Sequence, residues 1–181
     1  SPVRLLLTKP SDVPVFVEHG AADAGIAGLD VIREAGADLY EPLLLPFGYC
    51  RMVVAGKPAW SGRSLRLERS LRVATKFPRI AEDYFRRRGL SPEIIVVSGS
   101  VELAPLVHLA DLIVDLVQTG VTLRDNGLME LEFVLQSQAA LVLNRASYRL
   151  QAAPLRELID ALSRRAIAEA PNLAVPSLID G

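Results

Sequence analysis

Short apolar runs and amphipathic segments alternate along most of the chain. Apolar runs of about four to eight residues bounded by turn-forming residues are typical of buried strands, whereas apolar residues three and four positions apart are typical of helices. We therefore expect strands at residues 3–8, 23–28, 39–45, 50–55, 71–75, 93–98 and 112–117. We expect helices at about residues 12–19, 29–35, 78–88, 101–109 and 153–168, and a turn at 124–127 that leads into two further apolar segments, 128–135 and 139–143.

The alternation of strands with short helices predicts an α/β fold. Such strands usually form parallel βαβ units, and ligands bind at the loops beyond the carboxyl ends of the strands. The pattern breaks at residues 56–70, where a turn-forming segment is followed by a charged and weakly periodic one. We expect a surface excursion or a lobe boundary there, because a chain of 181 residues makes one domain or two small lobes.

Composition and charge exclude several classes of protein. Hydrophobic residues make up 50% of the chain and charged residues 23%, which are ordinary values for a globular protein. The longest apolar stretch, residues 103–117, is interrupted by His108, Asp111 and Asp115, so no segment predicts a membrane span. The 20 basic and 21 acidic residues nearly balance, which argues against binding to nucleic acid or to an anionic membrane. A single cysteine excludes a disulfide framework.

The common catalytic sequence motifs are missing as well. The patterns Gly-x-Ser-x-Gly, Walker A and Gly-x-Gly-x-x-Gly do not occur, so covalent catalysis has no candidate nucleophile. The two histidines, His19 and His108, have no His, Cys or acidic neighbours at metal-ligand spacing. The sequence therefore predicts no metal site made by the protein alone.

The most informative segment is the apolar strand at 112–117 and the loop that follows it. The strand carries Asp115 near its end and runs directly into the sequence QTGVT at 118–122. Glycine permits a tight turn, and successive backbone N–H groups with threonine hydroxyls suit a phosphate. Asp115 is placed to accept hydrogen bonds from sugar hydroxyls. The same residues also fit a plain strand, a turn and a helix-capping threonine.

Two further loops follow predicted strands. Lys76 lies between the strand at 71–75 and the helix at 78–88, where its charge could meet a phosphate. The strand at 93–98 ends in Ser-Gly-Ser, and Ser100 with Glu102 begins the next predicted helix. Ser100 and Glu102 either face the same ligand site or simply cap that helix, with acid favouring its first turn.

The order of these loops closely resembles the catalytic subunit of ATP phosphoribosyltransferase. The resemblance is carried by ATKFP at 74–78, SGSVELAP at 98–105, DLIVDLVQTGVTL at 111–123 and NGL at 126–128. Earlier and later stretches agree with it, namely PSDVP at 10–14, EHG at 18–20, DAGIAG at 23–28, FGYCR at 47–51 and LNRAS at 143–147. It covers about residues 4–165.

The resemblance implies a two-lobed α/β fold with mixed sheets, similar to periplasmic binding proteins. Lobe I would comprise residues 1–56 and 144–181, and lobe II residues 70–137, with 57–69 and 138–143 as connections. The substrates would lie between the lobes. Members of this family begin with a strand and a Lys-Gly-Arg loop ahead of the matched region, so we expect that strand and part of the substrate site to be missing here. The strand and the loop are either absent or trimmed from the chain, and we expect the second. Members of the family also usually have glycine in place of His108, so we expect different packing of that helix.

The implied reaction joins N1 of the adenine of ATP to C1 of phosphoribosyl pyrophosphate and releases pyrophosphate, as the first step of histidine biosynthesis. Asp115 would be the catalytic residue and would bind the ribose hydroxyls. Magnesium would accompany the pyrophosphate, with no protein ligand assigned. The residues that would bind phosphoribosyl pyrophosphate are Asp115, Gln118, Thr119, Gly120, Val121 and Thr122, and those that would line the cleft are Lys76, Ser100 and Glu102.

The resemblance also implies partners. Long members of the family carry a C-terminal regulatory domain that binds histidine, and 181 residues leave no room for one. We therefore expect the short form, a cytoplasmic homodimer within a hetero-oligomer that contains a regulatory subunit resembling histidyl-tRNA synthetase. A non-catalytic solute-binding protein of the same fold and a scaffolding role in a larger complex remain alternatives, because a fold does not determine a function.

Overall fold

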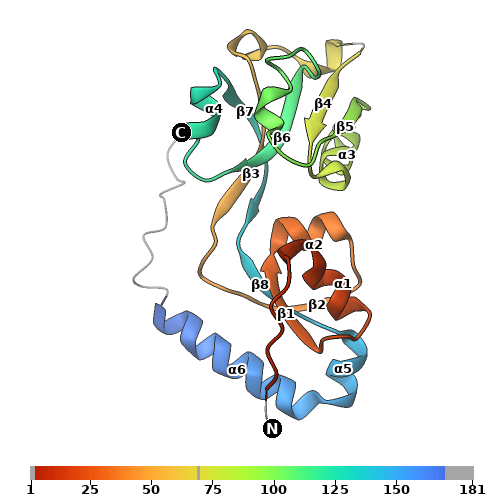
Figure 1. Ribbon diagram of the computed structural model, residues 1–181, viewed down its shortest axis with the longest axis vertical. Helices are drawn as coiled ribbons and strands as arrows, with labels where there is room; N and C mark the ends of the chain where they lie inside the picture. The colour runs from red at the N-terminus through yellow and green to blue at the C-terminus, as the bar shows by residue number, and fades with distance from the viewer. Residues whose placement is uncertain (1–2, 69, 170–181) are drawn as a thin grey trace. The chain divides into compact units, whose positions relative to one another are not determined.

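The computed structural model describes residues 3–68 and 70–169, which form two compact units (Figure 1). One unit combines the chain up to Gly48 with the chain from Gln138 onward, and the other comprises residues 49–137. Each unit has its own sheet and its own hydrophobic core.

The first unit is built around a three-stranded sheet of order β1-β8-β2. Both outer strands pair antiparallel with β8. The elements are η1 Pro10–Asp12, α1 Val13–Glu18, β1 Ala24–Gly28, α2 Leu29–Ala35, β2 Tyr40–Leu44, β8 Ala139–Leu143, α5 Arg145–Leu150 and α6 Ala152–Glu169.

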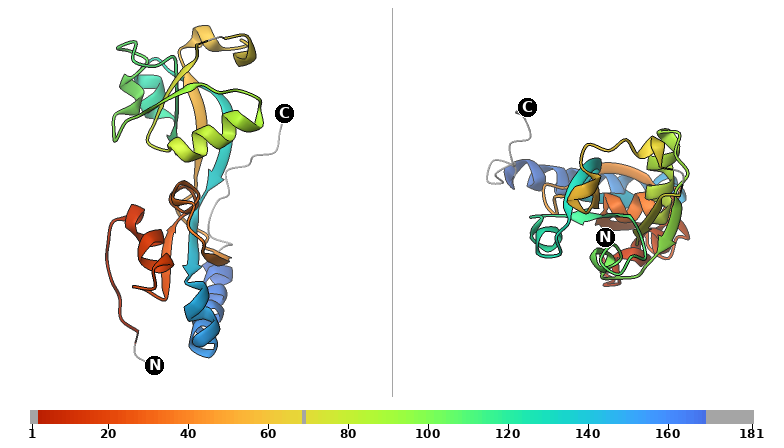
Figure 2. Two further views of the ribbon diagram at one scale, coloured as in Figure 1. Left: turned by 90° about the vertical axis from the view of Figure 1, so that its right-hand side faces the viewer. Right: turned by 90° about the horizontal axis from the view of Figure 1, so that it is seen from above.

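The central strand β8 is apolar at every position because both of its faces are covered. Ala140 and Val142 pack in the cluster that contains Val17 of α1 and Ile32 of α2. Leu141 and Leu143 point to the other face and pack against Leu155 of α6. The left view of Figure 2 shows α1 and α6 on opposite sides of these strands. This period-two division between two helical layers is typical of a fully buried strand.

The second unit contains a five-stranded mixed sheet of order β5-β4-β6-β3-β7. β4 pairs parallel with β5 and β6, whereas β3 pairs antiparallel with β6 and β7. The elements are β3 Cys50–Gly56, η2 Pro58–Trp60, η3 Leu65–Leu67, β4 Arg72–Thr75, α3 Pro78–Arg87, β5 Glu93–Val96, η4 Val101–Leu103, β6 Leu112–Val117, α4 Val121–Asp125 and β7 Met129–Ser137.

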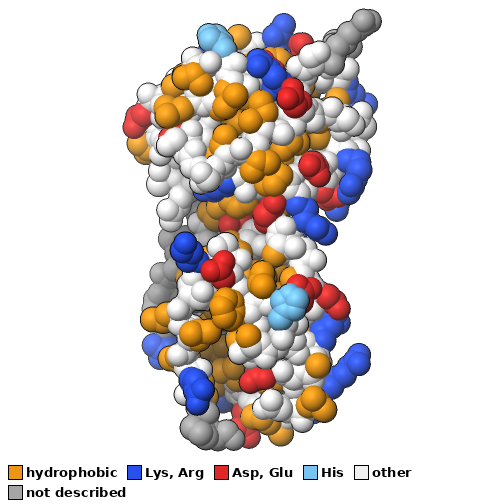
Figure 3. All heavy atoms as spheres, turned by 45° about the vertical axis from the view of Figure 1, so that its right-hand side comes forward, with side chains coloured by type: hydrophobic (Ala, Val, Ile, Leu, Met, Phe, Trp, Pro, Cys, Tyr) orange, Lys and Arg blue, Asp and Glu red, His pale blue; other side chains and the backbone are white. Residues whose placement is uncertain are grey.

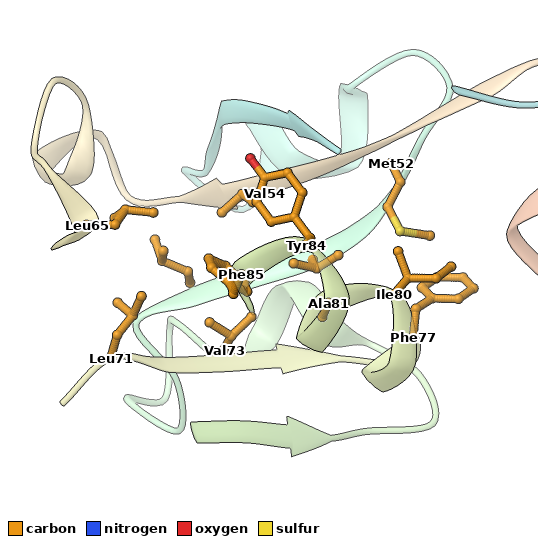
Figure 4. Close-up of a cluster of buried hydrophobic side chains, with 12 residues drawn as sticks. Met52, Val54, Leu65, Leu71, Val73, Phe77, Ile80, Ala81, Tyr84 and Phe85 are labelled. Carbon is orange, nitrogen blue, oxygen red and sulfur yellow. The ribbon is translucent and has the colours of Figure 1, made fainter. Parts of the chain in front are cut away.

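Hydrophobic clusters cover both faces of this sheet. On one face, α3 buries its predicted apolar stripe of Ile80, Ala81, Tyr84 and Phe85 against β3, β4 and β6 (Figure 4). On the other face, Val101 of η4, Ala104 directly after it and Leu123 of α4 pack against the strands. On the face drawn in Figure 3, acidic and basic side chains are interspersed and hydrophobic ones gather between them.

The structure corrects the predicted strand at residues 3–8. These residues form neither helix nor strand, and the side chains of Leu5 and Leu7 are 86% and 96% exposed. A strand requires hydrogen bonds from a neighbouring sheet edge, and composition alone does not show whether such an edge is available.

The predicted helix at 101–109 is also wrong. Only η4 is helical, and a series of turns follows it. His108 interrupts the helical conformation because its φ is 59°, in the left-handed region that favours glycine. The resembling family usually has glycine at this position, and we expected the packing there to differ. The difference in this chain is a strained backbone, at a residue whose side chain is exposed.

The boundaries of the predicted lobes need correction as well. β3, predicted to lie in lobe I, belongs to the second unit because it pairs with β6 and β7. Residues 138–143, predicted as a connection, contain β8, the central strand of the first unit. Residues 57–68 belong to the second unit. The part of the predicted lobe I at 170–181 lies outside the described residues.

Helical structure at the end of the described chain is more extensive than predicted. The sequence pattern did not indicate α5, whereas α6 matches the predicted final helix. Asn144 caps α5 by accepting a hydrogen bond from the Ser147 N–H at 2.8 Å. Among residues 3–68 and 70–169, no helix combines the length and the apolar character that a membrane crossing requires.

Replacing His108 by glycine should stabilise the fold. Left-handed backbone costs an L-residue about 1–2 kcal/mol, and the greater freedom of glycine in the unfolded chain offsets part of the gain. We expect His108→Gly to raise the free energy of unfolding by about 0.5–1 kcal/mol in urea titrations. His108→Ala keeps the strained conformation and is the matched control. A glycine variant no more stable than the alanine variant would contradict the prediction.

Candidate functional site

The parallel strands β4, β5 and β6 place three predicted loops at one edge of the second sheet. Because the strands run in the same direction, their carboxyl ends meet at that edge. Lys76 follows β4, Ser100 follows β5, and the loop 118–120 follows β6. The structure therefore brings the predicted site residues of this unit to the same edge of the sheet.

A buried threonine fixes the chain between β4 and α3. The Thr75 hydroxyl donates to the Val114 carbonyl at 2.7 Å and accepts from the Phe77 N–H at 2.9 Å. The side chain of Thr75 is fully buried. These two bonds join the turn to β6, and they hold Lys76 at the sheet edge.

Lys76 and Asp115 form an ion pair at this edge. The Lys76 ammonium lies 3.5 Å from Asp115 Oδ1, and their side chains are 42% and 20% exposed. Asp115 Oδ1 also accepts the Leu116 N–H at 2.8 Å. The carboxylate is thus held from two sides near the end of β6.

Burial raises the pKa of Asp115 above its ordinary value. The negative charge of Glu102 raises it further, whereas the Leu116 N–H and the Lys76 ammonium lower it. Burial is the largest of these influences. A carboxylate held in this way is a strong hydrogen-bond acceptor, and a ligand that brings hydroxyl donors or positive charge would relieve its desolvation.

The loop after β6 turns at a left-handed glycine and leads into a short helix. Gly120 has φ 74° and precedes α4, which begins at Val121 in the predicted loop. The first N–H groups of a helix have no intrahelical partner, and no side chain caps α4 at its N-cap. Gln118, Thr119, Val121 and Thr122 are exposed. The turn predicted at 124–127 is partly replaced by α4, which ends at Asp125.

Ser100 and Glu102 begin η4. Ser100 occupies the N-cap position with φ 49°, but its side chain makes no capping hydrogen bond. The capping role considered for Ser100 is therefore absent. Glu102 lies in the first turn, half-buried and close enough to influence the pKa of Asp115.

Sequence reasoning assigned no role to Arg51 of β3 and Glu130 of β7, which lie beside the same loop. The Arg51 Nε lies 3.0 Å from Glu130 Oε2 and its Nη2 lies 2.5 Å from Oε1, which is a two-point contact. The hydrogen bond to Glu130 raises the pKa of the guanidinium. A charged residue within the otherwise apolar strand at 50–55 was the signal available in the sequence.

The described residues do not build a metal centre by themselves. Within residues 3–68 and 70–169, no group of three or more His, Cys, Asp or Glu side chains could hold a metal ion. Asp115 and Glu102 are two carboxylates near one another, and Asp115 is already paired with Lys76.

Replacing Asp115 by asparagine should change how stability depends on pH. With a raised pKa, the folded chain holds more protons than the unfolded chain between the ordinary value of 3.8 and the raised value. The free energy of unfolding due to Asp115 therefore falls as pH rises through this window. Asp115→Asn removes this loss, so the melting temperature of the variant minus that of the wild type should be larger at pH 7 than at pH 4.

The control for this prediction is Asp160→Asn, at an exposed position of α6. Calorimetry at both pH values provides the measurement. An equal difference at pH 4 and pH 7 for Asp115→Asn would show that the buried carboxylate does not carry the effect.

Comparison with known proteins identifies relatives over most of the chain. The family model of ATP phosphoribosyltransferase matches residues 9–164. An ATP phosphoribosyltransferase of Moorella thermoacetica is 52% identical over 169 residues, which are 91% of this chain and 74% of that protein. One from Caldanaerobacter subterraneus is 49% identical over 157 residues, 87% of this chain and 73% of that protein.

Solved structures agree with the sequence relatives. A chain of the ATP phosphoribosyl transferase (HisG:HisZ) complex from Thermotoga maritima matches with a TM-score of 0.78 and 37% identity, over 87% of this chain and 77% of that one. The periplasmic aliphatic sulphonate binding protein SsuA from Escherichia coli matches with a TM-score of 0.62 and 14% identity, over 90% of this chain and 61% of that one. The second match shows the fold alone, which is the two-lobed fold of periplasmic binding proteins. The family model and the relatives together show that this chain belongs to the ATP phosphoribosyltransferase family.

Proposed function

We propose that this chain catalyses phosphoribosyl transfer to ATP, the first step of histidine biosynthesis. In this reaction a bond forms between N1 of adenine and C1 of the ribose, and the bond from C1 to the pyrophosphate oxygen breaks. The observation that supports it best is the ion pair of Lys76 with Asp115, at the sheet edge where the loop 118–122 begins, in a chain of this family.

The loop 118–122 is the proposed site for the 5′-phosphate of the ribose. Its unpartnered helix-start N–H groups, with the hydroxyls of Thr119 and Thr122, supply the donors that a phosphate needs. Gln118 stands at the entrance, and Gly120 and Val121 contribute backbone. Glycine at position 120 provides the positive φ that the turn requires.

Asp115 is the proposed catalytic residue. Its carboxylate would accept hydrogen bonds from the ribose hydroxyls and stabilise the positive charge that develops on the sugar as the bond to pyrophosphate lengthens. Lys76 is placed to attract the departing phosphates, and Ser100 and Glu102 line the same edge. Such a reaction depends mainly on alignment and on electrostatic stabilisation, which fixed side chains can supply.

Magnesium is best treated as part of the substrate. Because the described residues contain no three-ligand group, the ion would arrive bound to the pyrophosphate of phosphoribosyl pyrophosphate. Magnesium is commonly held by substrate phosphates with only one or two carboxylates. Charge neutralisation of the leaving group is the chemistry it would supply.

Asp115→Ala and Thr119→Ala should each lower the rate of transfer while the fold persists. A hydrogen bond to a charged group contributes about 1.5–3 kcal/mol, so we expect kcat/KM for phosphoribosyl pyrophosphate to fall by about tenfold to a hundredfold. Asp160→Ala is the control at an exposed aspartate. Unchanged turnover in both site variants would exclude this site.

Thermal-shift measurements on the same variants distinguish a phosphoribosyltransferase from a solute-binding protein. Phosphoribosyl pyrophosphate with magnesium, at about a hundred times its dissociation constant, should stabilise the wild type by about 2.7 kcal/mol and the variants by less. Tight binding of an amino acid or an oxyanion, with no effect of phosphoribosyl pyrophosphate on the melting temperature, would favour a solute-binding protein.

We also propose that the chain works as a homodimer within a hetero-oligomer that contains a regulatory subunit resembling histidyl-tRNA synthetase. The support is the similar chain of Thermotoga maritima, which was solved in a HisG:HisZ complex. Light scattering should show a dimer of the chain alone and a larger complex after the regulatory subunit is added. A mass unchanged by that subunit would contradict the proposal. The cytoplasm, which supplies ATP, is the proposed location.

A further inference from the structure

The ion pair of Arg51 and Glu130 reaches the proposed phosphate loop through a third nitrogen. Glu130 occupies Nε and Nη2 of the guanidinium, and Nη1 lies 3.5 Å from the carbonyl oxygen of Gln118. A second guanidinium acts one residue later, where Arg124 Nη1 lies 3.5 Å from the carbonyl oxygen of Thr119. Two consecutive carbonyls of the loop therefore face arginine side chains.

Gly120 lies beside this charged cluster. A Cβ atom at position 120 would lie 3.4 Å from Glu130 Oε1 and 3.4 Å from Arg124 Nη1. Ordinary van der Waals contact begins at these distances, so position 120 requires glycine for its positive φ rather than for space.

The planarity of the peptide bond converts these carbonyl contacts into an orientation of the N–H groups. In a trans peptide, the carbonyl of one residue and the N–H of the next point in opposite directions. Because the Gln118 carbonyl faces Arg51, the Thr119 N–H points away from Arg51. Because the Thr119 carbonyl faces Arg124, the Gly120 N–H points away from Arg124. Both donors are thereby turned in the direction opposite to the arginines.

The Arg51–Glu130 pair lies near the surface. Its side chains are 33% and 35% exposed, so solvent screens part of the attraction between the two charges. The two-point contact fixes the plane of the guanidinium, and with it the direction of Nη1.

We propose that Arg51 is a positioning residue for phosphoribosyl transfer, and that Glu130 holds Arg51 in place. Arg51 keeps the Gln118 carbonyl turned toward its own guanidinium, so that the Thr119 N–H is already aimed at the phosphate before the substrate arrives. This inference rests on the proposed function, because it takes the loop 118–122 as the site of the 5′-phosphate.

The test compares Arg51→Met with Arg33→Met. Arg33 forms a two-point pair with Glu41, at 2.6 and 2.8 Å, in the other unit, which makes it a matched control. Arg51→Met should lower kcat/KM for phosphoribosyl pyrophosphate by about tenfold, which is about 1.4 kcal/mol, with KM for ATP changed by less than about twofold. Arg33→Met should leave both unchanged. Equal losses toward ATP and phosphoribosyl pyrophosphate for Arg51→Met would overturn the proposal.

Two further variants separate positioning from a merely structural role. Arg51→Lys retains the charge but cannot form the two-point pair and contact Gln118 together, so its kcat/KM should lie between those of the wild type and Arg51→Met. Glu130→Gln should also lower kcat/KM, and the double variant with Arg51→Met should be no worse than Arg51→Met alone, because Glu130 acts through Arg51. Additive losses would contradict that assignment of Glu130.

Thr119→Ala separates a failure of the Arg51 proposal from a failure of the proposed phosphate site. If Thr119→Ala lowers kcat/KM for phosphoribosyl pyrophosphate and Arg51→Met does not, the loop is the phosphate site and the positioning role of Arg51 fails. If neither variant changes this value, the loop is not the phosphate site and the proposed assignment fails with it. Melting temperatures near that of the wild type would show that each variant is folded.

Discussion

The parallel pairing of β4 with β5 and β6 is the constraint on which the candidate site depends. Parallel strands need crossover connections, and their carboxyl ends lie at one edge, so residues that are far apart in the sequence become neighbours there. The Thr75 hydroxyl strengthens this arrangement by joining the turn after β4 to β6. The contact between Lys76 and Asp115, which are 39 positions apart, follows from that pairing.

The sheet edge also explains why Asp115 is costly to the fold and yet suited to the proposed chemistry. A position near the end of β6 is buried enough to raise the pKa of the carboxylate, yet open enough for one oxygen to meet Lys76. An apolar residue there would suit the fold better, since the strand is otherwise apolar. Sites where a local rule of folding is broken are the ones where function is expected.

Sequence reasoning succeeded where a regular period decides the structure. The apolar spacing of α3 identified all four of its buried residues, and the strand pattern located β1, β4 and β6 closely. It failed at residues 3–8, where strand formation depends on a neighbouring edge, and at the segment around His108, where a left-handed residue interrupts the helix. Arg51 was missed because it meets the loop after β6 through the pairing of two strands that lie far apart in the sequence, and no spacing within one segment reveals such a contact.

The side chains of Arg51, Arg124 and Glu130 orient the loop 118–122, which its own short helix holds only weakly. α4 has only five residues and no side-chain cap, so its own dipole and capping hold the preceding turn weakly. Guanidinium groups on the carbonyl side supply an orientation that does not depend on the ligand, and Glu130 fixes one of those groups in turn. Donors that are oriented in advance need no reorganisation when charge develops or arrives, and this is the main way in which a protein site improves on water. Arg51 of β3 and Arg124 of α4 therefore give this short turn a fixed orientation, which is what the proposed phosphate site requires.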